Sequence, residues 1–121
     1  MPGRQGSPRR IFDDLATEAT TVHSRFPHAL VAFMVVFPAP CISAAHQRAT
    51  IETLERLARR TSVDGAPYMA EAISLVVWNP SDGSLDAGIP PVSSPLRIEQ
   101  FSTQVESVYV SRYKGLPPHT D

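Results

Sequence analysis

The sequence predicts a small α/β domain in which three helices flank two principal parallel strands. Two observations carry this prediction. Apolar residues recur at helical spacing in three segments, and two continuous apolar runs separate these segments, in the order helix, strand, helix, strand, helix. The length of 121 residues fits one domain with a modest core.

The first strand is expected over Ala29–Phe37, nine apolar residues bounded by prolines. Such a run is typical of a strand that is buried on both faces, and it is too short to span a membrane. The second strand is expected over Ile73–Trp78, ended by Asn79 and Pro80. A right-handed crossover between them predicts that the two strands are parallel.

The three helices are expected over Arg10–Arg25, Ala44–Arg60 and Pro95–Tyr113. Ser94 and Pro95 resemble an N-cap followed by the first helical residue. Arg112 is expected to extend outward from the end of the last helix. The expected buried faces are Ile11, Leu15, Ala19, Val22 and Phe26 in the first helix, Ile51, Leu54, Leu57 and Ala58 in the second, and Ile98, Phe101, Val105, Val108 and Tyr109 in the third.

Two strands are too few for a stable free sheet. We therefore expect short strands from the loops, or a partner chain that completes the sheet. A homodimer joined through a strand edge or a helix face is one such arrangement.

Composition indicates a soluble protein with flexible ends. Residues 1–9 form a basic arm, residues 10–114 the domain, and residues 115–121 a tail. The formal net charge of −1 argues against bulk attraction to nucleic acid or anionic membrane. No apolar signal segment follows the N-terminus, and a single cysteine fits a reducing cytoplasm.

The arginines are the candidate nucleic-acid contacts. The basic arm contributes Arg9, and Arg10 follows it at the start of the first helix. On the second helix, Arg48, Arg56 and Arg60 share a ladder with Glu52 at i, i+4 spacing. The arm could contact phosphates. The alternative is a disordered tail and a solvated helix face with weak ion pairs.

Other polar residues offer weaker candidates. His23 could be a catalytic base or a satisfied, partly buried side chain. Cys41 precedes a helix and could be a nucleophile with His46 or His23, or an inert filler. The histidine spacing does not indicate zinc.

The acidic residues fit ordinary structural roles. Asp14 and Glu18 could share a magnesium ion, or form a solvated face. Asp82 and Asp86 lie after the second strand, where α/β proteins place ligands, but a turn at Asp82-Gly83 also explains them. No metal site and no cofactor is predicted, and no nucleotide-binding or hydrolase motif is present.

The stretches RIFDDLATEA and FPHALVAFMVVFP, in their order, resemble part of the restriction-endonuclease-like family, the PD-(D/E)XK nucleases. The resemblance is one of element order over residues 10–113. The family's metal-binding Asp and its Asp/Glu-x-Lys strand would fall before residue 10, where no Asp, Glu or Lys occurs. The resemblance therefore implies the carboxyl half of such a nuclease, with no catalytic residue of its own.

Three functions remain open from the sequence. The first is a catalytically incomplete nuclease-like domain that binds DNA or a nuclease partner, whose metal-dependent activity the partner would complete. The second is a small homo-oligomeric interaction module with no nucleic-acid role. The third is a small enzyme that uses Cys41.

Overall fold

The computed structural model describes residues 8–39 and 44–113. The elements are α1 (Pro8–Arg25), β1 (Ala32–Pro38), α2 (Ala44–Leu57), β2 (Ala72–Trp78) and α3 (Ile98–Tyr113). The element order and the α/β class predicted from the sequence are confirmed. Within the described residues, no helix is both long enough and apolar enough to cross a membrane.

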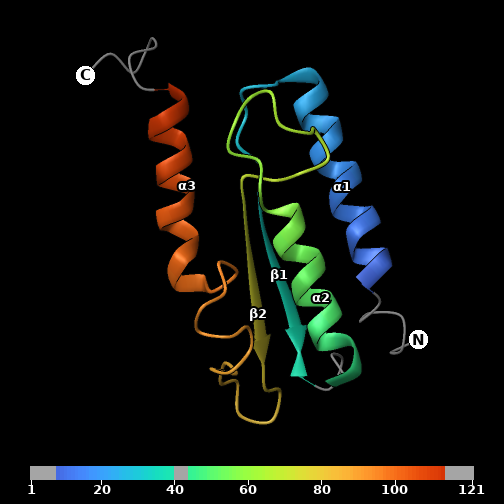
Figure 1. The fold of residues 1–121 in the computed structure, drawn as a ribbon. Coiled ribbons are helices and arrows are strands. Elements are labelled where there is room, and N and C mark those ends of the chain that lie inside the picture. The colour runs from blue at the N-terminus through green and yellow to red at the C-terminus, as the bar shows by residue number, and fades with distance from the viewer. Residues whose placement is uncertain (1–7, 40–43, 114–121) are drawn as a thin grey trace.

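The sheet has two parallel strands in the order β1-β2, as predicted. Ala32 pairs with Ala72 at one end and Pro38 with Trp78 at the other. Figure 1 shows α1 and α2 on one side of the strands and α3 on the other, beside β2. The domain therefore has three layers, and the middle layer is narrow.

The main core lies between the sheet and the pair α1 and α2. Side chains of alternate residues in a strand point to the same face, so one face of β2 and the partly buried residues of β1 meet the apolar stripes of the helices. The core members are buried: Ala19, Val31, Phe37, Ile51, Leu54, Leu57, Ala58, Ala70, Ile73, Leu75, Val77 and Leu96.

The other face of the sheet is covered only in part. Under α3, Ala72 and Ser74 of β2 are buried. On β1, Ala32, Met34 and Val36 are exposed. The prediction that the first strand is buried on both faces is therefore wrong, because α3 covers the half of the sheet that β2 forms.

Three element ends differ from the predictions by three residues, and the other differences are smaller. The first strand begins at Ala32, not Ala29. The second helix ends at Leu57, not Arg60, and the third begins at Ile98, three residues after Pro95. Before α3, the Ser94 hydroxyl accepts a hydrogen bond from the Leu96 N–H at 3.1 Å and donates one to Glu55 Oε2 at 2.7 Å. Ser94 thus fixes a turn that precedes the helix.

The expected apolar faces hold for most, but not all, residues. Val108 of α3 is buried, and Phe101 and Val105 are partly buried, whereas Ile98 and Tyr109 are exposed. Phe26, at the end of the first expected face, is 60% exposed. Its position just after the last residue of α1 places it outside the core.

Candidate functional site

The most enclosed polar site consists of Glu71 and the three side chains that contact it, those of His23, Arg60 and Arg112. We call these four residues the Glu71 cluster. Glu71 directly precedes β2 and is fully buried. Its Oε2 accepts hydrogen bonds from Nη1 of Arg60 at 2.5 Å and Nη1 of Arg112 at 2.8 Å. Its Oε1 accepts one from the Val31 N–H at 2.8 Å and lies 3.0 Å from Nε2 of His23.

The cluster joins the whole fold at the amino end of the sheet. His23 comes from α1, Arg60 from the chain after α2, and Arg112 from α3, while Val31 directly precedes β1. Burial alone raises the pKa of Glu71, but the Val31 N–H, the two arginines and His23 together lower it by more. Glu71 is therefore an ionised, fully paired carboxylate whose role is to hold these segments together.

The prediction that Arg60 belongs to an exposed ladder on the second helix is wrong, because Arg60 is 1% exposed. Besides Glu71, its guanidinium donates to the carbonyl oxygens of Gly65 at 3.3 Å, Pro27 at 3.0 Å and Val63 at 2.8 Å. The helix ends before Arg60, so its side chain leaves the helical spacing and turns inward. Its guanidinium therefore donates its hydrogen bonds to groups within the protein.

The expectation that Arg112 extends outward is also wrong, because its side chain extends inward. Its side chain is 2% exposed, and Nη1 also donates to the Ala29 carbonyl oxygen at 3.0 Å. Its Nε and Nη2 are buried and have no hydrogen-bond partner among the described residues. Nearby, the Tyr113 hydroxyl donates to the His28 carbonyl oxygen. Together these bonds fix the end of α3 to the chain that leads into β1.

His23 is a buried side chain with partners, which is the second of the two predicted alternatives. Its Nδ1 lies 3.0 Å from the Pro67 carbonyl oxygen, and Nε2 lies 3.2 Å from that of Ala29. With 3% of the residue exposed, the ring is shielded from any bulky substrate. Local spacing indicated no carboxylate partner for His23, and the fold supplies Glu71, which is 48 residues away along the chain.

The remaining candidate arginines do not form one patch with Arg60. Arg10 lies 4.0 Å from Asp14 and Arg48 lies 3.6 Å from Glu52, both as exposed i, i+4 pairs. Arg56 is exposed, and its Nη2 donates to Thr53 Oγ1 at 3.5 Å. Arg9 lies in α1, but its side chain is outside the described residues. Exposed pairs of this kind contribute little to stability.

The candidate acidic and sulfur sites receive no support as metal or catalytic centres. Cys41 is outside the described residues, and His46 is exposed on α2. No group of three or more His, Cys, Asp or Glu suited to a metal ion occurs in the described residues. Asp82 Oδ1 accepts hydrogen bonds from the Ser84 N–H and hydroxyl, which lower the pKa of Asp82. The turn interpretation of Asp82 is therefore the one that the geometry supports.

An apolar surface lies on the face of the sheet that carries α3, in the part that α3 does not cover. Met34 and Val36 are 53% and 52% exposed. Val36 pairs with Val76, whose side chain points to the same face, and exposed Ile98 lies beside Val76 in the same cavity wall. We call these four residues, Met34, Val36, Val76 and Ile98, the open sheet face.

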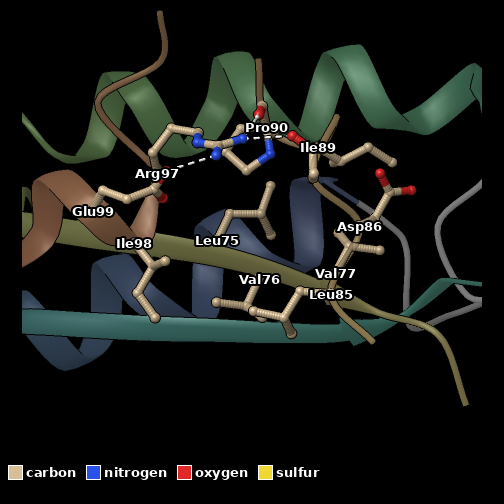
Figure 2. Close-up of a pocket in the computed structure, with 11 residues that line it drawn as sticks. Leu75, Val76, Val77, Leu85, Asp86, Ile89, Pro90, Arg97, Ile98 and Glu99 are labelled. Atoms are coloured by element: carbon tan, nitrogen blue, oxygen red, sulfur yellow. Dashed lines mark hydrogen bonds and ion pairs between the residues drawn. The ribbon is translucent and has the colours of Figure 1, made fainter. Parts of the chain in front are cut away.

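A cavity with a volume of ≈ 310 Å³ lies along the outer edge of β2. Figure 2 shows the side chains that line it, which come from β2, the following loop and the start of α3. Eight of its lining residues are apolar: Leu75, Val76, Val77, Leu85, Ala87, Ile89, Pro90 and Ile98. The cavity is thus an apolar space at the carboxyl end of a parallel strand, where α/β folds place ligands.

A scan against known protein families finds no match, and comparisons with curated proteins and with solved structures find none either. We therefore infer the function from the geometry of this chain.

Proposed function

We propose that this protein is a small interaction module that self-associates through β1. The observation that carries the proposal is that β1, an edge strand of a two-stranded sheet, is uncharged along its full length and exposes Met34 and Val36. The proposal selects the second of the functions that the sequence left open.

The backbone of β1 supports this proposal. Within the described residues, β1 pairs on one side only, with β2. Half of its N–H and C=O groups therefore point away from its only partner. Soluble proteins protect such edges with charged side chains, bulges or internal prolines. The sequence AFMVVFP has none of these before its last residue.

The open sheet face supports the same conclusion from the side chains. Met34 and Val36 are large apolar residues beside Val76, and α3 does not cover them. Burial of a large apolar side chain stabilises an assembly by about 1.5–3 kcal/mol. Met34 and Val36 are 53% and 52% exposed, so a partner that covers this face gains roughly half of this free energy for each of them, in addition to backbone hydrogen bonds at the edge.

A second copy of the chain is the partner that this arrangement favours. A two-stranded sheet is at the lower limit of stable size and relies on the helices that pack against it, so a second copy that extends the sheet would stabilise the fold. A two-fold axis beside β1 would pair two β1 strands antiparallel and give a four-stranded sheet. Met34 and Val36 of both copies would then lie on the same face, between the two α3 helices.

The decisive experiment is the mass in solution, measured by light scattering over a range of concentrations. We expect a dimer whose melting temperature rises with concentration. Val36→Lys places a charge on the open sheet face and should give a monomer. Val92→Lys is the matched control, because Val92 is 81% exposed in a loop outside this face, and it should remain a dimer.

Three results distinguish the alternatives. A monomer at every concentration would contradict the proposal. A dimer that Val36→Lys leaves intact would place the interface elsewhere. A mass that rises with a short DNA duplex at low salt and falls at high salt would favour the nuclease-like hypothesis instead, and Arg48→Ala with Arg56→Ala should then weaken binding.

A further inference from the structure

Within the described residues, the outer edge of β2, opposite to β1, pairs with the following loop on either side of Val76, and the pairing after Val76 includes a bridge between Trp78 and Leu85. The Leu75 N–H donates to the Leu96 carbonyl oxygen at 2.9 Å, and the Asp86 N–H donates to the Val77 carbonyl oxygen at 2.7 Å. Between Asp86 and Leu96 the chain leaves the edge. The cavity of ≈ 310 Å³ lies in the gap.

The backbone of β2 directs two further groups to this gap. In an extended strand, the N–H and C=O of one residue point to the same side. Because the Leu75 N–H and the Val77 C=O point to the loop, the Leu75 C=O and the Val77 N–H do so as well. Among the loop hydrogen bonds of the described residues, none involves these last two groups.

The walls of the cavity are apolar and its charged residues are already engaged. Nη1 of Arg97 donates to the carbonyl oxygens of Ala87 at 2.6 Å and Pro90 at 3.1 Å, and Nη2 lies 2.7 Å from Glu99 Oε2. Figure 2 shows these contacts at the cavity rim, with Leu75, Val76 and Ile98 below them. Arg97 therefore holds the loop in place and leaves the backbone groups as the polar elements of the site.

We propose that this cavity binds one apolar amino-acid residue in extended form, flanked by amide groups. The N–H of the bound residue donates to the Leu75 carbonyl oxygen, and its C=O accepts from the Val77 N–H. This is the pattern of a parallel strand residue opposite Val76. Its side chain packs against Val76 and Ile98. The volume is at the lower end of the range of small-ligand sites, which fits a single residue.

The backbone groups of this site lie at the opposite edge of the sheet from β1, so they are separate from those of the proposed self-association, although the cavity shares Val76 and Ile98 with the open sheet face. The probe for the test is N-acetyl-leucine N-methylamide, added to the ¹⁵N-labelled full chain. We expect a saturable shift of the Val77 amide resonance in ¹H–¹⁵N spectra, since that N–H gains an acceptor. Ala87→Phe should fill the cavity and weaken binding at least tenfold. Val92→Phe, a similar change outside the cavity, should leave binding unchanged.

A second ligand tests the recognition of the amide. The analogue in which an ester oxygen replaces the N–H of the leucine residue lacks the donor to Leu75, and we expect at least tenfold weaker binding. Equal binding of the amide and the ester would overturn the proposal. Absence of a saturable shift at Val77, or a shift that Ala87→Phe does not reduce, would overturn it as well.

Discussion

Arg112 and Glu71 are 41 residues apart in the chain, and Nη1 of Arg112 lies 2.8 Å from Oε2 of Glu71. This contact ties the last turn of α3 to the residue that precedes β2. Arg60 reaches the same carboxylate oxygen from the end of α2. One buried carboxylate therefore fixes the positions of two helices that lie on opposite sides of the sheet (Figure 1). In a domain with only two strands, this polar cluster supplements a small apolar core.

We expect Glu71→Gln to be strongly destabilising. The amide keeps the size of the side chain but removes the negative charge, so two buried guanidinium groups lose their counter-ion. Removal of one partner from a buried ion pair costs about 3–5 kcal/mol. Urea denaturation should show this loss in the free energy of unfolding. Glu99→Gln, which removes an exposed partner of Arg97, should cost less than about 1 kcal/mol. Equal losses for the two variants would contradict the structural role of the cluster.

Stability should also fall at acid pH through Glu71. The folded-state pKa of Glu71 lies below its ordinary value of 4.5, so the folded state favours the ionised form more than the unfolded state does. The stabilisation is fully present above pH 4.5 and is lost as the pH falls through the folded-state pKa. Urea midpoints between pH 7 and pH 3 should show this decline. The decline should be shallower in Glu71→Gln, and an identical pH profile in both proteins would contradict the prediction.

Arg60 and Arg56 should respond differently to the same substitution. Arg60→Met removes a buried cation that bonds to Glu71 and three carbonyl oxygens, so we expect a loss of about 3–5 kcal/mol in the free energy of unfolding. Arg56→Met changes an exposed side chain and should stay within about 0.5 kcal/mol. Thermal and urea unfolding of both variants measure the difference. If Arg60→Met were as stable as Arg56→Met, the inward position of Arg60 would be wrong.

Local pattern was sufficient to predict much of the fold. Helical spacing located all three helices, and the two apolar runs with a helix between them indicated parallel strands. The pattern could not show that Met34 and Val36 are exposed, because an apolar run has the same appearance whether one face or both are covered. The covering depends on where α3 packs, which is a tertiary property.

The Glu71 cluster was not predicted from the sequence, for a related reason. Its members come from four separate parts of the chain. Helical spacing assigned Arg60 to solvent, and Arg112, at the end of the buried face of the last helix, was expected to extend outward. The only local signal was Glu71 itself, an acidic residue directly before a buried strand. Such a residue requires a buried cation, but the sequence does not indicate which arginine supplies it.

The last prediction concerns Thr50, which lies in α2 and is 1% exposed. Its Oγ1 is buried and has no hydrogen-bond partner among the described residues. A buried hydroxyl without a partner costs about 1–3 kcal/mol, and valine has the same shape without that group. We therefore expect Thr50→Val to raise the free energy of unfolding by about 1 kcal/mol. The control is Thr21→Val, because Thr21 is exposed and its hydroxyl donates to the Thr17 carbonyl oxygen at 2.9 Å. Urea denaturation should show a gain for Thr50→Val alone, and a loss there would mean that the hydroxyl is satisfied in solution.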